Sequence, residues 1–319
     1  MTTTAKVTAD NYVRAESDFQ MRGYAEAMDC FGKFAVQRTH YDVDNQVTVR
    51  GNRDTIYMFG TFDLGSSPLT ITMPDPGDRY QSLMLINEDH SIPPAVYGPT
   101  TSTLTMEEMG TRYILMCVRT FADPDDPADM AIAQALQDAV VVEQDDIGSL
   151  DDMPVWDKEG VETLRAGINV LSATMSDTST FFGEKDKIDP LHHLMGTALG
   201  WGGLPREAAV YSNVYPEKND GKTPYTLTVG DVPVDAFWSV IVYDSKGWIV
   251  KNARDIYSYN NITAKKAADG SITIHFGGDP EADNYIPIME GWNIIVRMYR
   301  PGQEILDGTF QFPAPSPVA

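Results

Sequence analysis

The sequence predicts a mainly β protein with helices, organised as two β domains with a helical segment between or beside them. Three observations lead to this fold class. Short segments of β-forming residues fill positions 47–122, helical patterns replace them at 127–200, and β-rich segments return from about residue 208. A chain of 319 residues is long enough for two ordinary domains, and we place their border near residue 205.

The chain begins with a helical pattern at residues 8–29. Apolar residues recur there at roughly helical intervals: Val13, Phe19, Met28 and Phe31. Thr8 precedes them and is a residue type that caps helix N-termini. We therefore expect one helix, capped by Thr8.

The next part of the chain alternates between β-rich segments and turns. The β-rich segments are VTVRGNRDTIYMFGTFDL, LTITMP, RYQSLMLIN and TRYILMCVRTF. Clusters rich in Gly, Pro, Ser and Asp separate them: GSSP, PDPGD and HSIPPAVYGPT. This spacing predicts an antiparallel sandwich or a barrel-like sheet.

Residues 127–200 carry helical signals. Pro127 follows Asp126 and suits the first turn of a helix. A second helix is predicted by apolar residues close to an i, i+3, i+7 pattern: Val161, Leu164, Ile168 and Leu171. A third is predicted in LHHLMGTALGWGG at 191–203, ending at its glycines.

The C-terminal part is again β-rich. Its strand candidates are PYTLTV, AFWSVIVYD, GWIV, SITIHFGG and WNIIVRMYR. DSKG at 244–247 and PGQ at 301–303 have the composition of hairpin turns.

The charge and the apolar runs limit the classes of partner. The net charge of −22 disfavours binding to nucleic acids and to anionic membranes. The apolar runs are far shorter than the roughly 20 residues that span a bilayer. The N-terminus lacks the basic and apolar blocks of a secretory signal, and the two cysteines, Cys30 and Cys117, lie in apolar surroundings typical of buried, reduced thiols. These points favour a cytoplasmic protein.

Several motifs resemble a bacterial family built from two paired domains of unknown function, numbered 1254 and 1214. NRDTIYMFGTFDL, INEDH and DPLHHLMGTALGWGGLP resemble its N-terminal half. DVPVDAFWSVIVYD, YSYNNITAKKAADGSITIHFGG and GWNIIVRMYRPGQEILDGTFQFP resemble its C-terminal half. The resemblance covers about residues 40–318. One departure is GGDPEADNYIPI, which lacks the two cysteines that many relatives carry in that loop.

The resemblance implies two jelly-roll-like β-sandwich domains with helices beside them. Residues 1–205 then form the N-terminal domain, with the N-terminal helix and the helical insert 127–200, and residues 206–319 form the C-terminal domain. The family has no agreed catalytic residues. Some relatives carry a carboxylesterase label, and a role in the envelope or in biofilms has been suggested.

The segment Asn52, Arg53 and Asp54 is the first candidate site. Alternation along a strand places Asp54 on the face of Ile56 and Met58. A carboxylate there needs a partner, because an isolated buried charge is very costly. Two interpretations remain open: a structural ion pair or strand cap, and a pocket carboxylate oriented by Arg53.

The second candidate is NEDH, residues 87–90. Asp89 and His90 place a carboxylate beside an imidazole, the combination used in general acid–base catalysis. The same residues also suit a solvated turn. Tyr97 lies on the stiff, proline-bearing loop that follows and is a candidate pocket wall.

Aromatic and amide residues form a third set in the C-terminal half. We expect Trp238 and Tyr257 there, with Asn52 and Tyr57 of the N-terminal half, to contact a small-molecule ligand. An aromatic core is the alternative explanation for the C-terminal set. For Arg297, on a predicted strand, we favour a structural ion pair over carboxylate binding.

The sequence predicts neither a metal nor a cofactor. His192 and His193 are adjacent and point about 100° apart on a helix. The acidic stretch 121–152 contains DPDDPAD, but this motif lacks the glycine and the distant glutamate of an EF-hand loop. GxSxG, the P-loop and the dinucleotide fingerprint are all missing from the sequence.

Two functions remain. The first is an enzyme that acts on a small molecule, a hydrolase without the serine elbow, using Asp89 and His90 with Asp54 or Arg53 in support. The alternative is a non-catalytic ligand-binding or self-assembling protein. Either protein is expected to be a symmetric homo-oligomer, a dimer or a tetramer.

Overall fold

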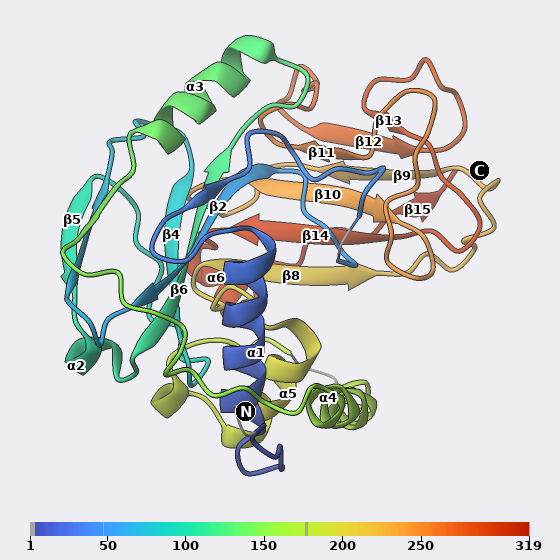
Figure 1. Ribbon diagram of the computed structural model, residues 1–319. Coiled ribbons are helices and arrows are strands. Elements are labelled where there is room, and N and C mark those ends of the chain that lie inside the picture. Colours follow the sequence, from blue (N-terminus) through green and yellow to red (C-terminus); the bar gives the residue numbers. More distant parts are fainter. Residues whose placement is uncertain (1–3, 47, 176–177, 319) are drawn as a thin grey trace. The chain divides into compact units, whose positions relative to one another are not determined.

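A computed structural model describes residues 4–46, 48–175 and 178–318. The chain divides into two compact units. The first unit comprises the chain up to Arg38 together with Tyr57–Phe121 and Ala128–Arg206. The second comprises Thr39–Ile56, Ala122–Pro127 and the chain from Glu207 onward. Each unit contains two β-sheets, and the first also contains most of the helices (Figure 1).

The first unit has a four-stranded and a three-stranded sheet. The four-stranded sheet has the order β1 (Ala35–Val36), β2 (Thr55–Asp63), β6 (Tyr113–Phe121) and β4 (Gln81–Asn87). The three-stranded sheet has the order β5 (Thr100–Leu104), β3 (Leu69–Met73) and β7 (Val141–Gln144). Apolar residues of both sheets meet in one core, which includes Phe62, Ile71 and Met116. Burying these faces stabilises the pair of sheets as a sandwich.

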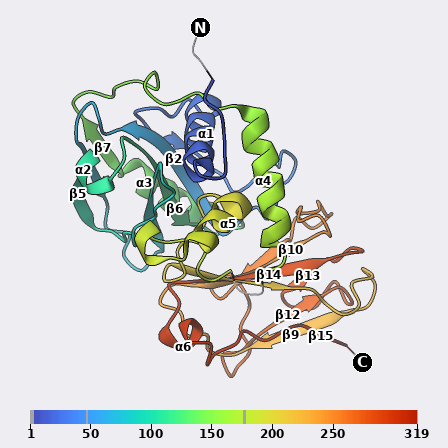
Figure 2. The ribbon, with the colours of Figure 1, turned by 90° about the horizontal axis from the view of Figure 1, so that it is seen from below.

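Six helices lie in or extend into the first unit. They are α1 (Tyr12–Ala27), α2 (Met106–Met109), α3 (Pro127–Asp138), α4 (Lys158–Ser172), the 3₁₀ helix Lys185–Lys187 and α5 (Pro190–Gly200). Helices α1, α4 and α5 pack against one another, as Figure 2 shows, around a second core that includes Tyr12, Val161 and Phe181.

The second unit has two four-stranded sheets. One has the order β11 (Ser258–Asn260), β10 (Trp238–Tyr243), β14 (Asn293–Tyr299) and β8 (Ala209–Val214). The other has the order β13 (Tyr285–Ile286), β12 (Ile272–Phe276), β9 (Tyr225–Val229) and β15 (Ser316–Pro317). Strand β13 runs parallel to β12, and the other recorded pairs of this unit are antiparallel. The two sheets enclose a core with Trp292 near its centre, and the short helix α6 (Gln303–Leu306) follows β14.

The expected β-rich, helical, β-rich layout is confirmed, and several elements differ in detail. Helix α1 begins at Tyr12 rather than at residue 8, with Asn11 as its N-cap residue. Thr8 is therefore wrong as the cap: its backbone N–H donates to Asn11 Oδ1, in a turn before the helix. Strand β7 lies inside the part predicted to be helical, because Val140 to Val142 are β-branched and pair with β3 more readily than they extend a helix.

Two expectations in the C-terminal part are wrong. GWIV is not a strand: the side chain of Gln46 binds the backbone N–H and C=O of Ile249 in place of a neighbouring strand. PGQ is not a hairpin turn, because Gly302 caps the short helix α6. Both cysteines are buried and free, as predicted. Within the described residues, no helix is long and apolar enough to cross a membrane.

Candidate functional site

His90 lies directly after β4 in the first unit, and its ring is almost fully buried. Its backbone adopts a φ of 53°, a left-handed conformation that is uncommon outside glycine. The ring stacks between His193 and Trp201, with centroid distances of 5.7 Å to each. Phe182 meets its edge at 6.1 Å. The ring is therefore held on both faces.

Hydrogen bonds fix the tautomer of His90. The backbone N–H of Gly202 donates to Nε2 at 3.0 Å, so this nitrogen carries no proton. The proton then lies on Nδ1, which is 2.8 Å from Thr197 Oγ1. Thr197 in turn donates to the backbone oxygen of His193 at 2.8 Å. Both ring nitrogens are used inside the protein, and burial followed by the nearby His193 lowers the pKa of His90 to about 3.

Two buried carboxyl groups lie beside this segment, Glu88 after β4 and Asp18 on α1. Glu88 Oε2 accepts the backbone N–H of Tyr113 at 2.9 Å. Asp18 Oδ2 accepts a hydrogen bond from the indole N–H of Trp156 at 2.7 Å. Asp18 Oδ1 has no hydrogen-bond partner among the described residues. Burial, and then the interaction with Glu88, raise the pKa of Asp18 to about 8. The raised pKa favours the protonated form of Asp18 near neutral pH.

Three charged side chains form a series of ion pairs from Glu88 to the surface: Arg14, Asp89 and Lys185. Arg14 lies 3.6 Å from Glu88 and donates to Asp89. Lys185 donates to the other oxygen of Asp89 at 3.0 Å. Burial opposes charge on Asp89, but the hydrogen bonds from Arg14 and Lys185 outweigh it and lower the pKa of its carboxyl. The exposed side-chain fraction rises from 5% at Glu88 to 29% at Asp89 and 50% at Lys185.

The sequence identified Asp89 and His90 but not Asp18 or Arg14. Helix α1 buries Glu16, Ser17 and Asp18 in succession, which the apolar pattern of the helix does not indicate. Neighbouring Glu16 is fully paired, with Arg165 binding both of its oxygens. The available signal was the run of polar residues inside the helix. Each of them also has a partner more than 100 residues away in sequence: Arg165 for Glu16, Trp201 for Ser17 and Trp156 for Asp18.

The second unit places Asp54 in a different environment. The side chain is buried and accepts the hydroxyl of Ser239 at 2.6 Å. Burial raises the pKa of Asp54 to about 6, against the opposing effects of Arg297, Ser239 and Arg53. Ser239 on β10 lies directly opposite Arg297 on β14 in the sheet register. Asp54 thus lies over one face of this sheet.

Arg297 is buried and makes hydrogen bonds to neutral groups. Its Nη2 donates to the backbone oxygen of Arg50 at 2.8 Å and to Tyr243 Oη at 2.9 Å. Tyr243 donates to the backbone oxygen of Gly51 at 2.6 Å. These contacts fasten residues 50 and 51 onto the sheet, so this polar segment is held by several partners.

The other candidate residues of the second unit also have defined surroundings. Arg53 donates to the backbone oxygen of Tyr41 at 2.8 Å and lies 5.0 Å from the ring centroid of Tyr257. The amide of Asn52 donates to Tyr299 Oη at 3.2 Å. Trp238 is part of the apolar core between the two sheets. Asn52, Arg53 and Asp54 belong to the second unit, whereas Asp89 and His90 belong to the first.

Tyr57 and Tyr97 are half-buried in the first unit. Tyr57 stacks on Phe59 at 5.5 Å, and Arg119 lies 5.6 Å from its ring centroid. Tyr97 lies 6.1 Å from Tyr80. Both rings are thus packed against other side chains of the first unit.

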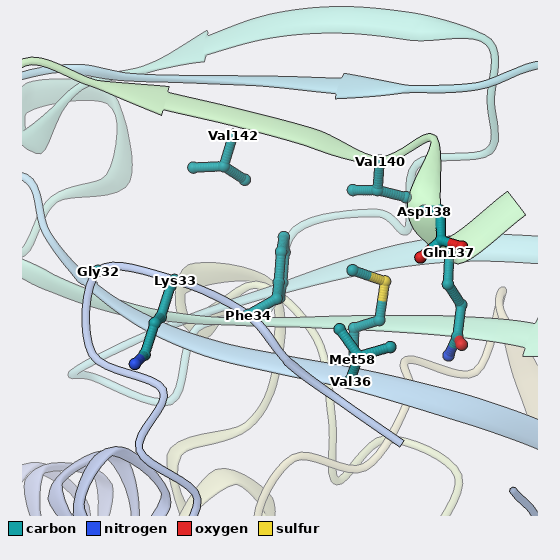
Figure 3. Close-up of a pocket in the computed structure, with 9 residues that line it drawn as sticks. All are labelled: Gly32, Lys33, Phe34, Val36, Met58, Gln137, Asp138, Val140 and Val142. Carbon is teal, nitrogen blue, oxygen red and sulfur yellow. The ribbon is translucent and has the colours of Figure 1, made fainter. Parts of the chain in front are cut away.

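A pocket of about 320 Å³ opens in the first unit between β1 and β7. Figure 3 shows Val140 and Val142 facing Phe34 and Met58 across it. The polar groups at its border are already bound: the amide of Gln137, for example, donates to the backbone oxygens of Gln37 and Tyr57. The pocket therefore suits the apolar part of a small molecule.

No group of three or more His, Cys, Asp or Glu side chains is arranged to hold a metal ion in the part of the chain that the structure describes.

Two families match the chain. Residues 31–103 match the protein of unknown function DUF1254, and residues 210–303 match the protein of unknown function DUF1214. The chain thus pairs a DUF1254 region with a DUF1214 region, as its motifs predict. No curated protein sequence matches the chain.

Two crystal structures are similar to this chain. The VPA0106 protein from Vibrio parahaemolyticus has a TM-score of 0.74 and 18% sequence identity, over 98% of each chain. At this identity the likeness shows a shared fold. An uncharacterized protein from Burkholderia cenocepacia has a TM-score of 0.48 and 13% identity, over 91% of this chain and 85% of that one.

Proposed function

We propose that this chain, which pairs a DUF1254 region with a DUF1214 region, is an enzyme that acts on a small molecule, most simply a hydrolase. The observation that carries the proposal is a buried pair of interacting carboxyl groups, Asp18 and Glu88, in which the pKa of Asp18 is raised. Hydrolysis needs a group that gives a proton to the leaving atom and one that takes a proton from water. A carboxyl pair with one proton contains both.

The hydrogen bonds assign a role to each member of the pair. Asp18 holds the proton on Oδ1, because Oδ2 already accepts from Trp156. Glu88 accepts from Tyr113 and lies nearer the surface. Glu88 is therefore the group that exchanges a proton with substrate or water. Asp18 is the group that exchanges a proton with Glu88.

Arg14 and Asp89 form the outer part of the same site. Arg14 lies between the buried pair and the half-exposed Asp89, so it orients both carboxylates. Its charge and that of Lys185 are largely balanced by these carboxylates, which suits a neutral polar substrate better than a strongly anionic one.

His90 is a positioning residue in this proposal. Its nitrogens bind Gly202 and Thr197, so the ring fastens the loop that carries Glu88 and Asp89 onto α5. A ring with a pKa of about 3 and no free nitrogen is a poor proton carrier near neutral pH.

Kinetics on a panel of chromogenic esters and glycosides tests the proposal. Glu88→Gln removes the charge of the pair at almost constant shape. We expect kcat/KM to fall by at least about 100-fold, the usual contribution of a general acid or base. Glu26→Gln removes an exposed carboxylate from the same helix as Asp18 and should leave kcat/KM unchanged. His90→Asn should lower the free energy of unfolding but should not shift the pH profile of kcat/KM.

Two results would oppose the enzyme proposal. One is the lack of any turnover by the wild-type protein across the panel. The other is unchanged kcat/KM in Glu88→Gln with the circular dichroism spectrum preserved.

Ligand binding without turnover is the second candidate, and the pocket in Figure 3 favours it. Its volume of about 320 Å³ lies at the small end of ligand sites. Val142→Trp would fill the pocket. If a small apolar ligand raises the melting temperature of the wild-type protein but not of this variant, binding at the pocket is supported.

We also propose a jelly-roll-like topology for the sheets and a cytoplasmic location for the protein. Two four-stranded sheets in the second unit support the topology. Two buried, free cysteines support a reducing compartment.

A further inference from the structure

The pocket of the first unit lies where its sandwich is open. Strands β1 and β7 are the end strands of their two sheets, and residues of both line the pocket. Phe34, Val140 and Val142 line it as well as packing against the core between the sheets. The apolar floor of the pocket is therefore continuous with that core, and an occupant lies between the edges of the two sheets (Figure 3).

The size and the walls of the pocket limit the occupant to a small aliphatic molecule. The volume is about 320 Å³. A water-sized group takes about 30 Å³ in a liquid, so there is room for about ten non-hydrogen atoms. Val36, Val140 and Val142 present branched aliphatic side chains, and the flexible side chain of Met58 adapts to its neighbours. An alkyl chain fits walls of this kind.

The polar residues at one end of the pocket come from the end of helix α3. Gln137 and Asp138 are the last two residues of this helix, and Figure 3 shows them at the opposite end from Lys33. The amide of Gln137 already donates to two backbone oxygens. Asp138 Oδ1 accepts from Arg38, whereas Oδ2 takes part in no hydrogen bond within the described residues. One carboxylate oxygen at this end is thus open to a donor.

Charge at this end favours a cation over an anion. The carboxylate of Asp138 and the C-terminal end of the α3 dipole are both negative, and Arg38 balances only part of them. Lys33 is paired with Asp29 at 2.6 Å, and its ammonium points away from Val142 (Figure 3). The net charge of −22 acts in the same direction, because it attracts cations to the protein and repels anions.

We propose that this pocket binds a primary alkylamine of about eight carbons, whose chain lies between β1 and β7 and whose ammonium binds Asp138. The ammonium donates to Oδ2, and burial of the chain against the apolar walls supplies most of the affinity. The inference rests on the ligand-binding candidate described above. It does not depend on Asp18 and Glu88, which are not among the lining residues.

Isothermal titration calorimetry of the full chain with three ligands of one chain length tests the proposal: octylamine, 1-octanol and octanoate, each below the concentration at which it forms micelles. We expect one octylamine per chain, bound about fivefold more tightly than octanol, the upper range for an ion pair at the edge of solvent. Octanoate should bind least. Asp138→Asn should remove the preference for octylamine and leave the affinity for octanol unchanged. Asp145→Asn is the matched control: it removes an exposed carboxylate just after β7 that does not line the pocket, and it should keep the preference.

The outcomes separate the ligand class from the pocket itself. Val142→Trp should abolish binding of octylamine and octanol while the circular dichroism spectrum is preserved. Equal affinities for octylamine and octanoate would overturn the amine, and so would a preference for octylamine that persists in Asp138→Asn. Binding that Val142→Trp leaves intact would place the ligand elsewhere on the acidic surface and overturn the proposal too. If none of the three ligands binds, the ligand-binding candidate fails together with the inference.

Discussion

At the scale of single residues, burial favours the uncharged form of ionisable groups in both units. The pKa of Asp18 is raised to about 8 and that of Asp54 to about 6, so both favour the protonated form in the folded protein. The pKa of His90 is lowered to about 3, so the fold favours its neutral form. The contribution of His90 is complete above about pH 6.5 and is lost as the pH falls toward 3.

The variant Asp18→Asn tests how the free energy of unfolding changes as the pH rises. A carboxyl whose folded pKa is about 8 destabilises the fold progressively as the pH rises from about 4 to 8. The upper bound for the whole shift of Asp18 is about 6 kcal/mol. The asparagine variant cannot ionise, so its free energy of unfolding should fall much less between pH 5 and pH 8.5 than that of the wild type.

Denaturant titrations at these two pH values measure the difference. Asp151→Asn, at an exposed carboxylate, is the control and should follow the wild type. Parallel pH dependence in wild type and Asp18→Asn would mean that Asp18 is already ionised in the fold.

At the scale of elements, close packing of α5 distinguishes two helical glycines. A Cβ at Gly196 would lie 2.3 Å from the backbone oxygen of Phe181, which cannot move as a side-chain end would. A Cβ at Gly23 in α1 would meet nothing within 4 Å. The same residue type is therefore required in α5 and dispensable in α1.

Alanine substitution should give opposite signs at the two glycines. Gly196→Ala forces α5 away from Phe181 and should lower the free energy of unfolding by about 1–3 kcal/mol. Gly23→Ala gains helix propensity and should raise it by about 0.5–1 kcal/mol. Chemical denaturation of both variants provides the measurement, and a stabilising effect of Gly196→Ala would contradict the contact at Phe181.

At the scale of the whole molecule, the net charge of −22 opposes the compact fold, because like charges on one chain repel each other. Salt screens this repulsion between exposed charges. The free energy of unfolding should therefore rise with ionic strength.

A salt titration tests this expectation. Raising NaCl from about 10 mM to about 100 mM shortens the Debye length from about 30 Å to about 10 Å. We expect the midpoint of urea denaturation to rise over this range. A midpoint that falls would mean that attraction between opposite charges outweighs the repulsion.

The sequence by itself determined the layout of the elements and the family regions. Local patterns carried this information: alternating β-formers in Thr55–Asp63, the proline at the start of Pro127–Asp138 and the glycines after Pro190–Gly200 each act within a few residues. The motifs at residues 50–64 and 87–90 also marked where buried polar groups occur.

Only the tertiary structure decided what those polar groups do. The partner of Glu88 is Asp18, about 70 positions away in sequence, and the partners of His90 are Thr197 and Gly202. Asp54 is bound by Ser239, from a strand much later in the chain. A pKa depends on burial and on neighbours in space, which local periodicity does not encode. For that reason the sequence indicated a polar segment at residues 87–90, whereas only the structure shows which groups bind each of its side chains.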